Sequence, residues 1–196
     1  MEKFDFLSLV KSRQSDRKYH DKPVEKEKLM RCLEAARLSP SACNSQPWTF
    51  IVIDDPSLKN AVAKETSGGL LPLNHFTSQA PVLIALVLEK PNITCRFGEV
   101  VKDKKFTIMD LGIAASHICL QAAAEGLGSC MLGWFNEKRV MELLELPAGK
   151  RPMLLISLGY PAGRKRKKIR KKPEEVFRYN SYKKQQQKEE LYPFNS

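Results

Sequence analysis

The segment from Thr107 to Glu125 constrains the fold most, because it has a helical pattern and is apolar on nearly every side. A helix without a polar face has to be buried. In a chain of 196 residues, burial on every side indicates that a second copy of the chain covers one face of the helix. Small residues such as Gly112 and Ala114 would let two copies approach closely. A central helix that is covered by one chain alone is the alternative.

Length and composition predict one domain, which we place at residues 1–182. The apolar run at 108–124 is interrupted by Asp110 and two other polar residues, which argues against a membrane span. No signal-peptide pattern precedes Arg13, so we expect a cytoplasmic protein.

Few side chains could carry chemistry by themselves. Five cysteines form no C-x-x-C pair, so we expect neither a disulfide framework nor a metal site. No Ser-His-Asp, Cys-His or paired-carboxylate arrangement can be built from the sequence, and we assign no catalytic side chain. His117 lies in the apolar helix without a metal-ligand partner four residues later, and we interpret it as a packing or interface residue.

The formal net charge of +11 is concentrated in a basic run at residues 164–172. Such a run could contact nucleic acid. It lacks the interleaved aromatic residues that stack on bases, and no nucleic-acid-binding module surrounds it. The favoured interpretation is a solvated loop in which one or two residues bind a cofactor phosphate.

Hydrophobic periodicity predicts that helices and strands make up most of the remaining chain. Further helices are expected to begin near Asp5, Pro23, Ser57 and Asn136. Strands are expected at residues 49–53, 82–88, 129–134 and 153–158. We interpret the strand at 49–53 as buried and the strand at 82–88 as central to the sheet.

Two segments have no clear period. Residues 91–106 carry mixed charges, and we expect a mobile surface segment that could cover a substrate, or an ordinary variable loop. Residues 183–196 are predicted to be a tail that is either disordered or docked on a partner subunit.

The loop at residues 39–48 is polar, framed by prolines and set between a predicted helix and a predicted strand. Its small side chains would let the backbone approach a ligand, and the prolines limit the disorder that binding must remove. Ser41, Asn44 and Gln46 can offer hydrogen bonds. The loop is therefore a candidate site for a flat, polar ligand.

Residues 13–17 form a second candidate segment. If it is extended, its alternation places Arg13, Ser15 and Arg17 on one side, where they can surround a phosphate. If it stays helical, only the two arginines share a face. A charged helix end that faces water is the alternative without a ligand.

Three motifs in the same order resemble the FMN-dependent nitroreductase family. They are Arg13-Gln14-Ser15-Asp16-Arg17, the loop at 39–48 and the segment from Gly126 to Gly133. The resemblance implies an α+β fold with three layers, α/β/α, and a mixed, mostly antiparallel central sheet flanked by helices. It also implies a homodimer with the long buried helix and the FMN sites at the subunit interface.

The resemblance also implies which residues bind FMN. They are Arg13, Gln14, Ser15 and Arg17, then Pro40, Ser41 and Asn44 of the partner subunit, then Met131, Leu132 and Gly133 through their backbone, and Arg170 or Lys171 at the phosphate. Gln14 departs from the usual arginine of the family, which removes one positive charge and leaves a donor. The alignment of the basic run with the family motif is uncertain, so Arg170 is the first candidate to bind the phosphate and Lys171 is the second.

The function implied by the resemblance is that of an FMN-dependent oxidoreductase. It would take hydride from NADH or NADPH and reduce nitroaromatic, quinone or similar conjugated acceptors by a ping-pong mechanism. The flavin itself carries this chemistry. Two alternatives stay open, namely the same fold with another flavin chemistry such as dehalogenation or flavin modification, and a basic nucleic-acid-binding protein.

Overall fold

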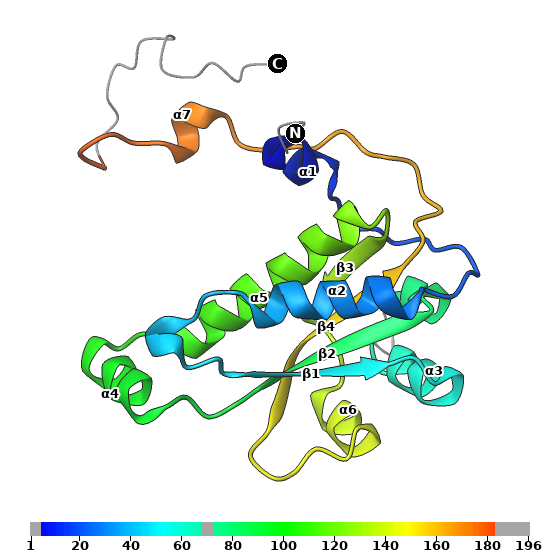
Figure 1. Ribbon diagram of the computed structural model, residues 1–196, viewed down its shortest axis with the longest axis horizontal. Helices are drawn as coiled ribbons and strands as arrows, with labels where there is room; N and C mark the ends of the chain where they lie inside the picture. The colour runs from blue at the N-terminus through cyan, green and yellow to red at the C-terminus, as the bar shows by residue number, and fades with distance from the viewer. Residues whose placement is uncertain (1–4, 68–72, 183–196) are drawn as a thin grey trace. The chain divides into compact units, whose positions relative to one another are not determined.

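The computed structural model describes residues 5–67 and 73–182. The chain divides into two compact units after Arg164, and each is described by itself (Figure 1). The first unit contains the sheet, and the second contains the short helix α7 (Pro173–Val176). A single domain over residues 1–182 stays a prediction, and the predicted tail at 183–196 lies outside the described residues.

The sheet of the first unit has four described strands in the order β1-β2-β4-β3. The strands are β1 (Trp48–Ile53), β2 (Val82–Leu88), β3 (Gly128–Leu132) and β4 (Arg151–Gly159). All three neighbouring pairs are antiparallel, and one parallel bridge joins Ser15 to Ser129 at the β3 edge. The expected mostly antiparallel sheet is therefore confirmed.

Burial along the strands follows their position in the sheet. β2 lies between β1 and β4, and its residues from Val82 to Val87 are all buried, as predicted for a central strand. The prediction of a buried strand at 49–53 is wrong, because only Ile53 of β1 is buried. β1 has a neighbour on one side only, and most of its side chains are partly buried against the core, with Thr49 exposed.

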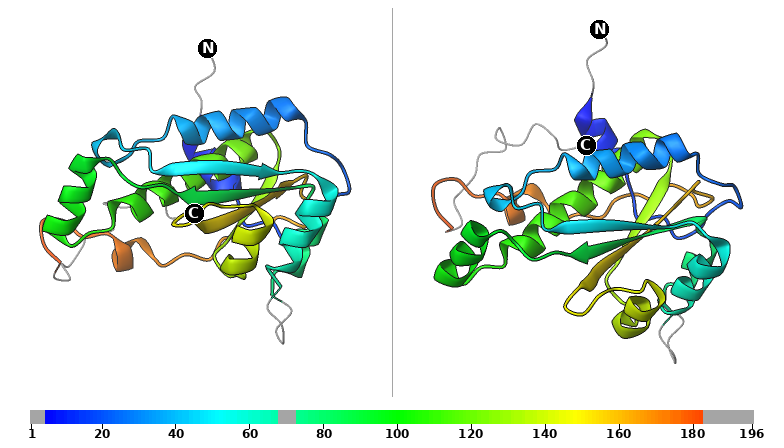
Figure 2. Two further views of the ribbon diagram at one scale, coloured as in Figure 1. Left: turned by 90° about the horizontal axis from the view of Figure 1, so that it is seen from below. Right: turned by 60° about the horizontal axis from the view of Figure 1, so that its bottom comes forward.

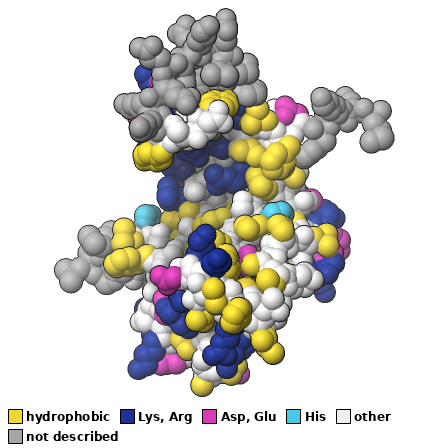
Figure 3. Space-filling model, turned by 90° about the vertical axis from the view of Figure 1, so that its left-hand side faces the viewer, with side chains coloured by type: hydrophobic (Ala, Val, Ile, Leu, Met, Phe, Trp, Pro, Cys, Tyr) yellow, Lys and Arg dark blue, Asp and Glu magenta, His cyan; other side chains and the backbone are white. Residues whose placement is uncertain are grey.

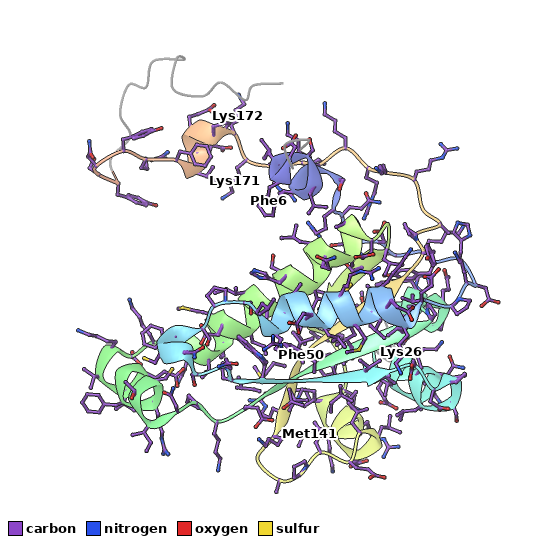
Figure 4. The ribbon with its side chains drawn as sticks, in the orientation of Figure 1. Phe6, Lys26, Phe50, Met141, Lys171 and Lys172 are labelled. Carbon is purple, nitrogen blue, oxygen red and sulfur yellow. The ribbon has the colours of Figure 1, made fainter. Side chains whose placement is uncertain are left out.

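Helices cover both faces of the sheet, which confirms the three-layer architecture (Figures 1 and 2). One face is covered by α2 (Lys26–Arg37) and α5 (Phe106–Ala124), and the other by α3 (Pro56–Lys64) and α6 (Glu137–Leu143). Phe50 of β1 packs on the cluster beneath α2 and α5 (Figure 4). Leu155 of β4 belongs to the cluster on the opposite side.

Three predicted helix starts are confirmed by their capping hydrogen bonds. Asp5 caps α1 (Phe6–Ser12), Asp55 caps α3 and Asn136 caps α6, each with a side-chain oxygen that accepts from a backbone N–H in the first turn. The predicted start at Pro23 is wrong. Helix α2 begins at Lys26 because Glu25 is extended, with ψ of 135°, and its carboxylate accepts a hydrogen bond from Tyr160 Oη at 2.5 Å.

Residues 91–106 are not an irregular loop as expected, because they contain α4 (Ile93–Lys102). Mobility and a role in covering a substrate stay predictions. Asn92 caps the helix by accepting from the backbone N–H of Cys95, which is its only buried residue. The large apolar side chains of α4 are exposed, including Phe97 at 70%. Figure 3 shows the side of the molecule on which α4 lies, where hydrophobic side chains gather between Lys and Arg side chains.

Helix α5 is buried on one face only within the first unit. Its inner face packs in the core through residues such as Leu111 and Ile118. Its outer face is exposed at positions with helical spacing, namely Met109, Gly112, Ile113 and Ser116. The first unit therefore covers α5 on one face only. Whether a second copy or the same chain covers the outer face stays a prediction.

Among the described residues, α5 is also long and apolar enough to cross a membrane by length and composition alone. The core helix of a soluble protein passes the same test, so this observation is weak. Because the inner face of α5 packs on α2 and the sheet, it behaves as a core helix.

Candidate functional site

Residues 13–17 are extended, which selects one of the two predicted conformations. Arg13 ends α1 with φ of −65° and ψ of 130°, and Ser15 forms the parallel bridge with Ser129. The N–H of Asp16 donates to the carbonyl of Ser129 at 2.9 Å. In such a segment alternate residues share a side, so Arg13, Ser15 and Arg17 share one side and Asp16 lies on the other.

The glycines after α5 make this approach possible. Gly126 has φ of 73° and ends the helix, as glycine commonly does. A Cβ on Gly128 would lie 2.7 Å from Asp16 Oδ2, so a side chain there would push residues 13–17 away from β3. A Cβ on Gly133 would meet nothing within 4 Å. Gly126 is thus favoured by its left-handed backbone conformation, and Gly128 is required by its contact with Asp16.

The donors on this segment suit an anionic group. Arg13 is half-buried and Arg17 is exposed, and neither forms an ion pair with any residue that the structure describes. Burial raises the pKa of the Cys119 thiol, and the nearby Arg13 guanidinium opposes that rise, which places Arg13 beside the second half of α5. Ser129 Oγ is buried, and its hydroxyl also lowers the pKa of the Cys119 thiol.

The loop at residues 39–48 is strained. Cys43, Asn44 and Gln46 have positive φ values of 51°, 49° and 47°, although none of them is glycine. Left-handed non-glycine residues cost energy and persist where the surrounding structure fixes them, often at ligand sites. The loop therefore has a built conformation, which agrees with its selection as a candidate site.

Two helices hold the loop in this conformation. The backbone N–H of Ala42 donates to both carboxylate oxygens of Asp110 on α5, at 3.1 Å each. Asn92 at the start of α4 donates from Nδ2 to the carbonyl of Cys43 at 3.0 Å, and from its backbone N–H to Ser45 Oγ at 2.9 Å. The loop is thus attached to α4 and α5.

The polar side chains of the loop form hydrogen bonds with one another. Ser41 Oγ accepts from the backbone N–H of Gln46 at 2.9 Å, and Asn44 Oδ1 accepts from Gln46 Nε2 at 3.1 Å. Pro40 and Asn44 are exposed. The roles of Pro40, Ser41 and Asn44 as cofactor contacts stay predictions.

Within one chain, the residues predicted to contact the cofactor lie near two separate parts of α5. The loop meets the first turns of the helix at Asp110, whereas Arg13 lies near Cys119. These two helix positions are nine residues apart, or about 14 Å along the axis.

Met131 and Gly133 are exposed at β3, the strand that residues 13–17 meet. Leu132 lies between them and is buried in the core. Because the Leu132 side chain is buried, only the backbone of Leu132 could contact a ligand. Arg170 and Lys171 lie in the second unit, just before α7, so their relation to Arg13 stays a prediction. Figure 4 labels Lys171.

Sequence reasoning missed the residues that hold these segments in place. Asp110 is only 4% exposed, and burial raises the pKa of its carboxyl group while the hydrogen bond from Ala42 opposes the rise. An acid in an otherwise apolar helix was the available signal, and it was interpreted only as an interruption. Asn92 is a residue type that often caps helices. Its role is hard to see in the sequence because the residues after it show no clear hydrophobic period.

The sequence model of the Nitroreductase family matches residues 10–160 of this chain. The chain belongs to the nitroreductase family. This confirms the resemblance to the nitroreductase family, the α+β fold class and the prediction that the protein is an oxidoreductase. The matched span includes residues 13–17, the loop at 39–48 and the segment from Gly126 to Gly133.

Several characterised or solved proteins of this family resemble the chain. A protein of Methanothermobacter thermautotrophicus, named provisionally as an NADH dehydrogenase/NAD(P)H nitroreductase, is 34% identical over 164 residues, with 82% of this chain and 79% of that protein covered. An FMN reductase [NAD(P)H] of Bacillus subtilis is 29% identical over 191 residues, with 91% and 74% covered. The solved FMN-dependent nitroreductase of Clostridium difficile R20291 has a TM-score of 0.73 at 32% identity, with 90% and 99% covered.

Proposed function

We propose that this nitroreductase family member is an FMN-dependent oxidoreductase that takes hydride from NADH or NADPH and reduces nitroaromatic, quinone or similar conjugated acceptors by a ping-pong mechanism. The names of the FMN-dependent nitroreductase and the FMN reductase that it resembles support this cofactor. Bound FMN supplies the hydride and electron chemistry, so the protein has to bind, orient and shield it. A cytoplasmic location stays a prediction.

The phosphate of FMN is proposed to lie against the side of residues 13–17 that carries Arg13, Ser15 and Arg17. Two guanidinium groups without ion-pair partners in the described chain, beside a hydroxyl, match the charge and the hydrogen-bonding geometry of a phosphate. Arg170 or Lys171 is proposed to add one more positive charge.

One observation carries the proposal that the enzyme is a homodimer with shared sites. The strained loop and Arg13 lie at separate places along α5, and the outer face of that helix is apolar and exposed. A second copy on this face would bury Met109 and Ile113 and would contribute its own loop. Each FMN site would then combine Arg13 of one subunit with Pro40, Ser41 and Asn44 of the partner subunit.

The cofactor proposal is tested by reconstituting the purified protein with excess FMN, followed by gel filtration and an absorbance spectrum. We expect a retained flavin spectrum that NADH or NADPH bleaches under anaerobic conditions. Arg13→Ala should weaken FMN binding about 10- to 100-fold, because it removes a charged hydrogen-bond donor. Arg139→Ala is the matched control, since Arg139 is exposed on α6 and pairs with Glu142. Wild-type protein that retains no FMN would refute the proposal.

The dimer proposal is tested with Met109→Glu, which places a charge on the outer face of α5. Met109 is 56% exposed in the single chain, so the variant should fold but remain monomeric and bind FMN poorly. Ser57→Glu on α3, at the opposite face of the sheet, is the control. Light scattering coupled to gel filtration gives the mass of each variant. A monomeric variant that keeps full FMN affinity would contradict the shared site.

A further inference from the structure

Asp16 is held from several directions although it lies in a segment without regular structure. It is only 7% exposed. Its backbone N–H donates to the carbonyl of Ser129 at 2.9 Å, and its own carbonyl accepts from Tyr19 Oη at 2.9 Å. Its carboxylate Oδ1 accepts from Gln14 Nε2 at 2.7 Å. Both the backbone and the side chain of Asp16 are therefore fixed to the protein.

Gln14 directs its amide group toward Asp16 and the backbone of Arg164. Besides the bond to Asp16, its Nε2 lies 3.4 Å from the carbonyl oxygen of Arg164, so both amide hydrogens have an acceptor. Residues 14 and 16 share one side of the extended segment. The side that carries Arg13 and Ser15 is the opposite one. Gln14 thus has its donors turned away from the side where a phosphate would be bound.

Asp16 is packed against buried residues of the sheet. Tyr19 is buried, and its hydroxyl also shares a hydrogen bond of 2.8 Å with Ser157 Oγ on the central strand β4. Burial raises the pKa of Tyr19, so its hydroxyl stays protonated and available as a donor to Asp16. Gly128 of β3 lies close to the Asp16 side chain and leaves no room for a Cβ. The pair is enclosed between these residues.

We propose that Gln14 and Asp16 form a clamp that fixes residues 13–17 in the extended conformation, with Gln14 as a positioning residue and not a cofactor ligand. The clamp presents Arg13, Ser15 and Arg17 together, so that a phosphate meets ordered donors. What these donors bind rests on the proposed function. Gln14 lacks the positive charge of the arginine usual in the family. Its hydrogen bond to Asp16 instead orders the neighbouring residues Arg13 and Ser15.

A double-mutant cycle distinguishes a clamp from a direct ligand. Asp16→Asn removes the charge but keeps an acceptor oxygen, so FMN affinity should stay within about threefold of wild type. Gln14→Met and Asp16→Ala each break the clamp, and each should weaken FMN binding about tenfold. The double variant Gln14→Met/Asp16→Ala should also be about tenfold weaker, because both changes remove the same contact.

If Gln14 were a direct ligand, its loss would be independent of Asp16, and the double variant would be about a hundredfold weaker. That result would overturn the proposal, as would unchanged affinity in both single variants. Affinity is measured by quenching of flavin fluorescence. Thr66→Ala is the control, since it removes a buried hydroxyl that bonds to Thr77 Oγ1 at 2.8 Å beneath α3, and it should leave FMN affinity unchanged.

Hydrogen exchange provides a readout that does not need the cofactor. Peptides that contain the Asp16 amide should exchange about tenfold faster in Gln14→Met and Asp16→Ala than in wild type and Asp16→Asn. Unchanged exchange in both clamp variants would overturn the proposal, whatever the FMN result. If wild-type protein binds no FMN, the proposed function is refuted, and exchange alone then decides whether the clamp exists.

Discussion

Asn92 joins α4 to the strained loop, and its replacement tests whether that connection fixes the loop. Its Oδ1 accepts from the N–H of Cys95 at 2.9 Å, which caps the helix, while its Nδ2 donates to the carbonyl of Cys43 at 3.0 Å. Asn92→Ala removes both bonds. Asn92→Asp keeps the cap and removes only the donor to Cys43. Asn136→Ala is the control, because it removes a helix cap on α6, away from the strained loop.

The expected costs follow from counting these bonds. Loss of an Asn cap costs about 1 kcal/mol, and loss of one hydrogen bond to the loop costs about 1 kcal/mol. Asn92→Ala should therefore lose about 2 kcal/mol, and Asn92→Asp and Asn136→Ala about 1 kcal/mol each. For a unit of this size, 1 kcal/mol corresponds to about 2–4 °C in Tm.

Thermal unfolding of the three variants measures the total effect, and hydrogen exchange locates it. Exchange should rise in α4 and in residues 41–46 together for Asn92→Ala, because one side chain serves both. For Asn92→Asp it should rise mainly in the loop. If Asn92→Ala is no more destabilising than Asn136→Ala, or if loop exchange is unchanged, the side-chain bond from Asn92 does not hold the loop.

Two further predictions concern other contacts of the first unit. Gly128→Ala should cost about 1–3 kcal/mol in urea unfolding because its Cβ would lie 2.7 Å from Asp16 Oδ2, whereas Gly133→Ala should be nearly neutral. Equal costs would contradict the close approach. Arg31 lowers the pKa of Glu125 from 4.5 to about 2, so this pair stabilises the fold fully above pH 4.5 and loses its effect as the pH falls toward 2. Arg31→Gln should flatten the pH dependence of the free energy of unfolding in that window, and an unchanged slope would contradict the assignment.

The parts of the fold that could be predicted are those determined by neighbours in sequence. Asp5 and Asn136 act as caps through bonds that span three residues, so the sequence contains both partners. The central position of β2 was recognisable because a strand buried on both faces is apolar throughout. By contrast, β1 is also largely apolar, and only the strand order places it at the edge.

Helix α4 was missed for a different reason. Its apolar residues at 93, 97, 100 and 101 do have helical spacing, but they lie among charged residues and face solvent. A hydrophobic period is most readily recognised where it marks a buried face, and here the buried position is Cys95 alone. The start of α2 depended on Tyr160, a residue far away in the sequence, and was therefore not available to a local pattern.

In the candidate site, the extended conformation of residues 13–17 is one of the two that the sequence predicts, because that geometry is local. The orientation of Gln14 depends on Asp16 together with the carbonyl of Arg164, which only the folded chain brings near. The same holds for Asp110, which meets the loop through a backbone N–H and so leaves no side-chain pattern. Candidate binding residues were thus easier to nominate than the residues that position them.

Helix α5 connects the fold to the proposed site. Its inner face supplies Leu111 and Ile118 to the core, which accounts for half of its apolar composition. Met109 and Ile113 on the outer face are 56% and 37% exposed, so full burial would add about 1 kcal/mol each. Polar residues would suffice there if that face stayed in water. Because Asp110 fixes the loop to this same helix, a second copy that covers the outer face also determines where its own loop lies. Subunit association and cofactor binding are therefore expected to be thermodynamically linked, each stabilising the other.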